Sequence, residues 1–187
     1  MKRRVMAAVA LAAIVAFAGT GDAASRTSQA TVYDKDLRTK QLEFNVENAL
    51  LRLPYYDVFD NLGFEVGEKG TVRLVGQVRT ATLRRDAERA VKRLAGVEKV
   101  VNEIEILPVN IGDDRIRRAV YRALFNDSSL DRYALGAHPS IRIIVKHGRV
   151  TLAGIVNNQM DKTMAEFKAR GVFGVFGVTN NLAVEKS

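Results

Sequence analysis

In each half of the chain, the spacing of apolar residues changes in the same order along the sequence. Helical spacing comes first, as at Ile116, Val120 and Leu124 in the second half, and two alternating segments typical of strands follow. A second helical stretch, which includes Leu83 and Ala87 in the first half, precedes a last alternating segment. Each half is therefore predicted to fold as helix, strand, strand, helix and strand.

A direct repeat of the sequence links the two halves. Residues 70–78 read GTVRLVGQV and residues 148–156 read GRVTLAGIV, and the offset of 78 residues then holds without a gap to the last strand. The repeat indicates that one small module is present twice. Its most regular feature is a set of glycines, for which we expect a structural role in turns and strand bends: Gly70, Gly76, Gly96, Gly148, Gly154 and Gly174.

Together these patterns predict an α+β fold of two tandem αββαβ modules. In each module a three-stranded sheet would carry both helices on one face and bury a single core, which leaves the other sheet face open. The first module is expected at residues 41–108 and the second at 113–187, with a linker at 109–112 and Asp113 as the N-cap of the helix that follows. Residues 24–40 are polar and lack periodicity near their start, so they are expected to form a disordered leader.

The N-terminus has the pattern of a secretory signal peptide. Lys2, Arg3 and Arg4 precede an uncharged, mostly apolar run of 14 residues, and small residues surround Ala23 and Ala24. This run is shorter than the roughly 20 residues that span a bilayer as a helix. We therefore expect residues 1–23 to be removed, with cleavage after Ala23 or Ala24, and the mature chain to be periplasmic. Because the chain has no cysteine, no lipid anchor is expected.

The composition also limits the chemistry. The lack of cysteine excludes disulfides, thiolate catalysis and thiolate metal sites. His138 and His147 have no neighbour at a metal-ligand spacing, and no Ser, His and acid set or phosphate-binding loop can be assembled. We therefore expect no catalytic residues, no metal and no cofactor. The formal charge of +8, or +6 without residues 1–23, favours an anionic partner. Export favours lipid headgroups or acidic polymers over nucleic acid.

The ordered motifs resemble the BON domain family, a module of bacterial envelope proteins. The resemblance rests on the helical spacing of Asp113, Ile116, Val120 and Leu124, on the two Gly-x-Val-x-Leu-x-Gly-x-Val segments, and on a Gly-Val pair before each last strand. It covers nearly all of the mature chain. It implies attachment to phospholipid surfaces, support of envelope integrity under osmotic or other stress and, in some members, chaperone-like action. Since the lipobox cysteine of lipid-anchored members is missing, the chain looks more like the soluble, osmotically induced type.

The first helix of the second module gives one candidate binding surface. At about 100° per residue, Tyr121 and Phe125 project away from the predicted core together with Arg118 and Arg122. Aromatic rings at the headgroup boundary and guanidinium groups on phosphates would hold an anionic lipid surface. The alternative is that this face packs on the first module and buries its aromatic rings against the open sheet.

The loop before the last strand gives a second candidate. Phe173 replaces Ala95 of the first module and Phe176 replaces Glu98, so an exposed charged turn becomes an apolar one. This change indicates a membrane-dipping loop or a protein contact, and the alternative is that both rings fill gaps in the core. Residues 109–187 carry 12 basic and seven acidic side chains, against 10 and 11 in residues 41–108, which favours the second module as the anion-binding one.

These features predict a non-catalytic periplasmic protein that supports envelope integrity. Its second module would make peripheral contact with anionic phospholipid or with an envelope protein. The alternative is a chaperone-like or scaffold protein that holds envelope polypeptides on the open sheet faces. Liposome co-sedimentation would separate these two functions. Before any binding assay, the most useful observation is whether four aromatic residues are exposed in the folded protein: Tyr121, Phe125, Phe173 and Phe176.

Overall fold

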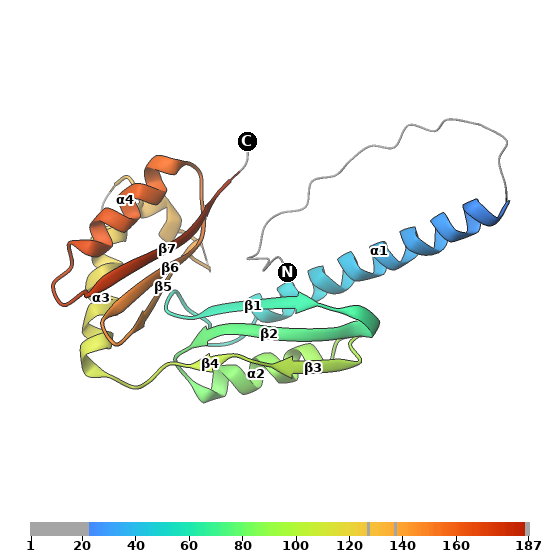
Figure 1. The fold of residues 1–187 in the computed structure, drawn as a ribbon. Coiled ribbons are helices and arrows are strands. Elements are labelled where there is room, and N and C mark those ends of the chain that lie inside the picture. The colour runs from blue at the N-terminus through green and yellow to red at the C-terminus, as the bar shows by residue number, and fades with distance from the viewer. Residues whose placement is uncertain (1–22, 127, 137, 186–187) are drawn as a thin grey trace.

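Two small α+β modules lie side by side, each with its own sheet and its own pair of helices (Figure 1). The computed structural model describes residues 23–126, 128–136 and 138–185, with side chains from residue 35 onward. Residues 1–22, which make up nearly all of the predicted signal peptide, lie outside the described part of the chain.

The first module has two helices and one mixed sheet. Its elements are α1 (Ala23–Leu51), β1 (Asn61–Val66), the 3-10 turn η1 (Glu68–Gly70), β2 (Thr71–Val78), α2 (Ala81–Lys92), β3 (Lys99–Asn102) and β4 (Glu105–Ile106). β1 is antiparallel to β2, with Phe64 opposite Leu74, while β3 and β4 both pair with β2 in parallel. The last strand that the sequence predicts is therefore present in two parts.

The second module repeats this order. Its elements are α3 (Ile111–Phe125), the 3-10 turn η2 (Asp131–Ala134), β5 (Ile141–Lys146), β6 (Arg149–Val156), α4 (Gln159–Arg170) and β7 (Gly177–Val184). β5 is antiparallel to β6, with Ile143 opposite Leu152, and β7 runs parallel to β6 along its whole length. The strands of the two halves form separate sheets, so the prediction of two tandem modules is confirmed.

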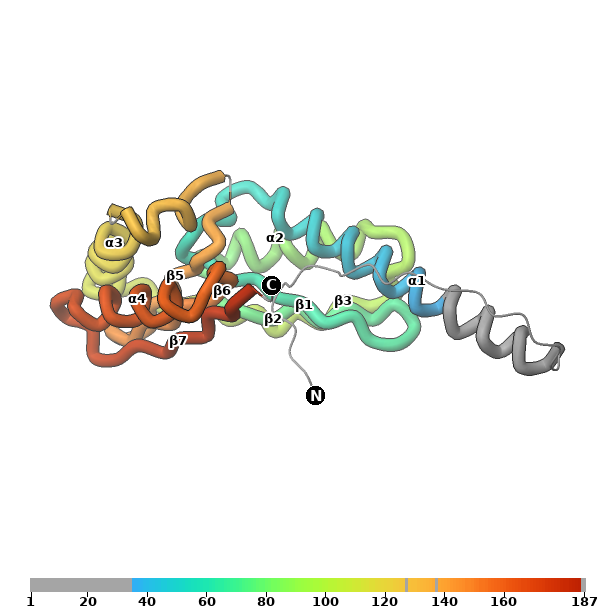
Figure 2. Tube along the Cα trace, turned by 90° about the horizontal axis from the view of Figure 1, so that it is seen from above, coloured from blue at the N-terminus to red at the C-terminus, as the bar shows by residue number. Residues whose placement is uncertain are grey.

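Each module buries its own core between its helices and one face of its sheet. In α1 the buried residues Leu42, Val46 and Leu50 recur every fourth position, and they pack with β2 and α2. In α3 the matching stripe is Ile116, Val120 and Leu124. Figure 2, turned by 90°, shows the first module's helices α1 and α2 on the same side of its sheet.

α1 begins earlier than the sequence predicts. Residues 24–40, expected to be a disordered leader, are helical. The expectation rested on the absence of apolar periodicity. Such periodicity indicates that one face of a helix packs on a core, and a helix can form without it. No glycine or proline occurs between Ala23 and Leu51 to interrupt the helix, so it continues beyond the part that packs.

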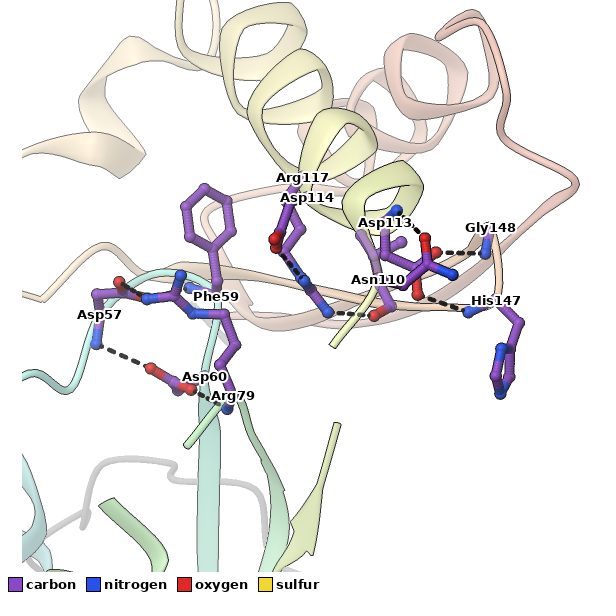
Figure 3. A network of polar contacts seen from close by, with 11 residues as sticks. Asp57, Phe59, Asp60, Arg79, Asn110, Asp113, Asp114, Arg117, His147 and Gly148 are labelled. Carbon is purple, nitrogen blue, oxygen red and sulfur yellow. Dashed lines mark hydrogen bonds and ion pairs between the residues drawn. The ribbon is translucent and has the colours of Figure 1, made fainter. Parts of the chain in front are cut away.

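The start of α3 also differs from the prediction. Asn110 is the N-cap, because its Oδ1 accepts a hydrogen bond from the backbone N–H of Asp113 at 3.1 Å. Two residues of the predicted linker, 111 and 112, are therefore helical. Asp113 is buried, and its carboxylate accepts hydrogen bonds from the backbone N–H groups of His147 (2.9 Å) and Gly148 (2.8 Å) in the β5–β6 turn (Figure 3).

One polar connection between helix and sheet is repeated in both modules. Asn102 Nδ2 donates to the Arg84 carbonyl at 3.2 Å and to Glu88 at 2.9 Å, which ties β3 to α2. At the offset of 78 residues, Asn180 Nδ2 donates to the Lys162 carbonyl at 2.8 Å and to Glu166 at 3.1 Å.

The two carboxylates gain further stabilisation from a neighbour on the same helix. Hydrogen bonds from Lys92 and Asn102 lower the pKa of Glu88, and those from Asn180 and Arg170 lower the pKa of Glu166.

The repeated glycines occupy positions that a side chain would disturb. All six predicted structural glycines have positive φ. The steric reason is clearest at Gly76 and Gly154, where an added Cβ would lie 2.0 Å from the Asn61 carbonyl oxygen and 1.9 Å from that of Ser140. The backbone at the start of the first strand thus passes directly against a glycine near the end of the second strand.

Candidate functional site

The two modules meet through residues 52–60, the segment between α1 and β1. The Val58 side chain is buried in the core of the second module, and its carbonyl accepts a hydrogen bond from the Ile143 N–H at 2.8 Å. β5 is an edge strand of its sheet, so Val58 satisfies part of an edge that would otherwise be unpaired. The cores are separate, but the second one is completed by a residue of the first module.

A charged cluster braces this segment on its own module (Figure 3). The guanidinium of Arg79 pairs with the Asp57 carboxylate and lies 5.3 Å from the centre of the Phe59 ring. Asp60 is 1% exposed, and its carboxylate accepts a hydrogen bond from the backbone N–H of Arg79 at 2.7 Å. Burial raises the pKa of Asp60, and the charge of Asp57 adds to this effect, although hydrogen bonds from backbone N–H groups oppose it.

A buried arginine of the second module completes the joint. Arg142 Nη1 donates to the Asp57 carbonyl at 2.9 Å, and its guanidinium lies 4.4 Å from the centre of the Tyr56 ring. Burial raises the pKa of the Tyr56 hydroxyl, which Arg142 partly offsets. The hydroxyl accepts a hydrogen bond from the Leu62 N–H at 3.4 Å. The joint is therefore built from charged and aromatic groups of both modules.

The aromatic residues predicted on α3 belong to this joint. Phe125 is buried with 8% exposure, which agrees with the alternative in which this face of α3 is covered and not with an exposed lipid-binding ring. Tyr121 is half-buried between Phe125, at a ring-centre distance of 4.9 Å, and Phe59 of the first module, at 6.1 Å. Phe125 belongs to the buried cluster of the second module together with Leu124, and Tyr121 packs against that cluster. The first module contacts Tyr121 through Phe59, which lies in the 52–60 segment and outside the sheet of that module.

The two predicted arginines of α3 remain at the surface. Arg118 and Arg122 are exposed, and with Tyr121 and Phe59 they line a shallow hollow at the joint. Phe59 was missed by the sequence prediction. The available signal was the aromatic run Tyr55, Tyr56 and Phe59 in a segment that the repeat does not include.

The loop between α4 and β7 exposes both of its predicted aromatic residues. Phe173 is 98% exposed and Phe176 is 79% exposed, so neither fills a gap in the core. The Phe176 N–H donates to the Gly148 carbonyl at 2.9 Å, and its ring lies so close to Gly148 that a Cβ there would be 2.5 Å away. The loop is thus held on the β5–β6 turn while its rings project into solvent.

The six predicted binding residues fall into two groups at different places on the second module. Three of them, Arg118, Tyr121 and Arg122, come together at the joint, with Phe125 beneath. Phe173 and Phe176 lie at the α4–β7 loop, next to the N-terminal half of α3, since Gly174 faces the Ile116 side chain.

The first module has a larger hollow, a groove of about 1200 Å³ between α1, the β1–β2 turn and the α2–β3 loop. Charges of both signs line it, including Lys35, Glu68, Lys69 and Glu98. Lys35 Nζ lies 3.9 Å from Glu68 Oε1. This mixed lining selects no particular class of ligand.

Two further classes of site were sought among the described residues. Among the described side chains of residues 35–185, no group of three or more His, Asp or Glu residues could hold a metal ion. In the same part of the chain, none of the helices has the length and apolar character needed to cross a membrane.

Comparison with known protein families gives a match to both modules. The family model described as BON domain matches residues 38–108 and 112–186. No curated protein matches the chain. Among solved structures, the chain is similar to the C-terminal domain of CdsD, described as a structural protein of the type III secretion system of Chlamydia trachomatis. That match has 12% identity and a TM-score of 0.32, and it covers 76% of this chain and 96% of the other. A second CdsD structure gives 12% identity and a TM-score of 0.32, covering 79% and 93%.

Proposed function

Because the chain belongs to the BON domain family, we propose that it is a non-catalytic envelope protein whose second module binds the surface of anionic phospholipid bilayers. Binding is peripheral and supports envelope integrity under osmotic or other stress. The periplasmic location is part of the same proposal, and the signal-peptide pattern of residues 1–23 supports it.

The observation that carries this proposal is the exposure of Phe173 and Phe176. Exposed phenylalanine side chains in one loop lose contact with water when they enter the boundary between headgroups and acyl chains. At the corresponding positions the first module has Ala95 and Glu98. The repeated fold therefore does not require aromatic residues there, and their presence in the second module needs a functional explanation.

The charge around the loop favours an anionic surface. Arg149 is exposed at the start of β6, and its guanidinium lies against Gly177, which directly follows Phe176. A guanidinium next to an inserted ring can pair with a lipid phosphate while the ring contacts acyl chains. The excess of basic residues in the second module acts in the same direction.

The chaperone-like alternative requires open sheet faces that suit apolar polypeptides. On the open face of the first module, Arg73 Nη2 lies 2.6 Å from Glu65 and its Nη1 lies 3.0 Å from Glu103. Such a charged surface is poorly matched to an unfolded apolar segment. This face of the first module therefore gives no support to the chaperone-like function.

Co-sedimentation with vesicles tests the proposal. The protein, purified from cells in its processed form, is mixed with phosphatidylcholine vesicles or with equimolar phosphatidylcholine and phosphatidylglycerol. We expect binding that rises with the anionic fraction and falls with added salt. Equal binding to both vesicles, or none to either, would contradict lipid-surface binding. Indifference to lipid charge together with suppression of client aggregation would favour the chaperone-like function.

A further inference from the structure

α4 carries a stripe of exposed apolar side chains on the side away from its sheet. Met160 is 76% exposed, Met164 is 36% exposed and Phe167 is 74% exposed. These residues are spaced by four and three positions, so at about 100° per residue they lie on one face. The buried residues Ala165 and Ala169 occupy the opposite side. The core of the module is complete without the stripe.

The first module shows that the fold does not need this stripe. At the offset of 78 residues, Met160, Met164 and Phe167 correspond to Thr82, Asp86 and Arg89 of α2. The two helices are otherwise equivalent, since each has 12 residues and packs against the sheet of its own module. The apolar face is thus a property of the second module alone, as are the exposed phenylalanines of the loop that follows α4.

A row of arginines lies on the neighbouring helix. Arg115, Arg118 and Arg122 are all exposed on α3. One flank of α3 contacts the first module through Tyr121, which packs on Phe59, and another flank packs against α4. The arginines lie between these flanks, on the outer side of the helix. The outer face of this helical layer therefore combines three guanidinium groups from α3 with three apolar side chains from α4.

We propose that this outer face, formed by Met160, Met164 and Phe167 of α4 with Arg115, Arg118 and Arg122 of α3, lies flat on the anionic bilayer surface. This inference rests on the proposed function and adds the orientation of the molecule. The apolar stripe enters the headgroup boundary, the arginines pair with phosphates, and the sheet of the second module faces away from the lipid. The loop that carries Phe173 follows the end of α4 and meets the bilayer at the margin of this face.

A second copy of the chain fits this face less well. Stable protein interfaces bury about 800 Å² on each partner, and three side chains over two helical turns are a small fraction of such an area. The arginine row and the net positive charge of the second module also disfavour a partner with the same charge. A bilayer requires no matching surface shape and supplies the opposite charge.

The absence of cysteine allows a direct measurement of orientation, since one introduced cysteine is a unique labelling site. Phe167→Cys and the matched Arg89→Cys are each labelled with an environment-sensitive fluorophore and mixed with phosphatidylcholine and phosphatidylglycerol vesicles. We expect the label at position 167 to shift to shorter wavelength and to be quenched by a headgroup nitroxide lipid. The label at position 89 is expected to remain in water.

The other outcomes of this labelling experiment distinguish failure of the inferred orientation from failure of the proposed function. If the protein binds vesicles but the label at position 167 stays in water, the inferred orientation is wrong and the proposed function stands. If the protein binds no vesicles, the proposed function fails and this inference with it. A shift of the label at position 167 that grows with protein concentration without vesicles would identify a second copy as the occupant and overturn the inference.

A variant that keeps the net charge provides an independent test. Met160→Thr, Met164→Asp and Phe167→Arg together give α4 the residues that the first module has at these positions. The added charges cancel and the altered side chains are exposed, so we expect an unchanged thermal unfolding midpoint. Vesicle affinity should fall at least about tenfold, because less apolar surface leaves water. Unchanged affinity in the folded variant would overturn the inference.

Discussion

The carboxylate of Asp113 accepts a hydrogen bond from the backbone N–H of Gly148 at 2.8 Å. It also accepts one from the N–H of His147, so a single buried side chain satisfies both donors of the β5–β6 turn. His147 and Gly148 both have positive φ, as expected for a two-residue hairpin turn. The first turn of α3 is thereby fixed to the end of the hairpin that supports Phe176.

We expect Asp113→Ala to lower the free energy of unfolding by about 2–4 kcal/mol, because two backbone donors lose their acceptor. Urea unfolding measured by circular dichroism gives this value. Asp131→Ala is the control, since Asp131 is an exposed acid of the same module, and its effect should stay below about 0.5 kcal/mol. If both variants were equally stable, the carboxylate would not be needed to hold the turn.

The repeated asparagines offer a matched pair of substitutions. Asn102→Ala and Asn180→Ala should each cost about 1–3 kcal/mol, since each removes hydrogen bonds to a helix carbonyl and to a glutamate. Hydrogen exchange should locate each loss in the module that carries the substitution. Asn181→Ala, at an exposed neighbouring position, serves as the control. Faster hydrogen exchange in the module without the substitution would show that the connection does not act locally.

Stability should decrease in acid because of the same glutamates. The pKa of Glu88 and that of Glu166 lie below the ordinary value of 4.5 in the folded protein. Their contribution is therefore fully present above pH 4.5 and is lost as the pH falls through the lowered values. Unfolding at about pH 7 and about pH 3 should show a smaller difference in Glu88→Gln with Glu166→Gln than in the parent. If the loss of stability between these two pH values were the same in the double variant and in the parent, other groups would cause the acid sensitivity.

The joint between the modules can be weakened at one residue. Val58→Ala should destabilise the second module by about 1–3 kcal/mol, since the side chain fills part of that module's core. The Ile143 N–H donates a hydrogen bond to the Val58 carbonyl, so faster exchange of this amide proton is the expected signature. Val109→Ala, at a side chain 95% exposed, should change neither quantity. Normal protection of Ile143 in Val58→Ala would mean that the joint does not depend on this side chain.

The sequence predicted the two modules because each helix and hairpin is encoded by residues that are close together in the chain. The glycine spacing of each hairpin and the helical stripes of α2 and α3 depend on neighbours within a few turns. The joint could not be predicted in this way, because Val58 and Ile143 are far apart in sequence and their contact completes a different module. For the same reason the helical wheel placed Tyr121 outside the core stripe of α3 but could not reveal Phe59, the residue of the first module that packs against it.

The candidate surfaces were predictable to different degrees. Phe173 and Phe176 were found because the repeat aligns them with Ala95 and Glu98. The same alignment sets Met160, Met164 and Phe167 against polar residues of the first module. Methionine and phenylalanine at helical spacing are, however, more often core residues. Only their exposure in the folded protein distinguishes a binding face from a buried one.

The central claim is that the exposed rings of the α4–β7 loop bind the second module to anionic bilayers. Its most direct test is the affinity of Phe173→Ser with Phe176→Ser for vesicles of equimolar phosphatidylcholine and phosphatidylglycerol, measured beside Leu135→Ser. Leu135 is also exposed, at 73%, but lies outside the loop. We predict at least an about tenfold loss of affinity in the loop variant and none in the control. Equal affinity of the folded loop variant and the parent would contradict the claim.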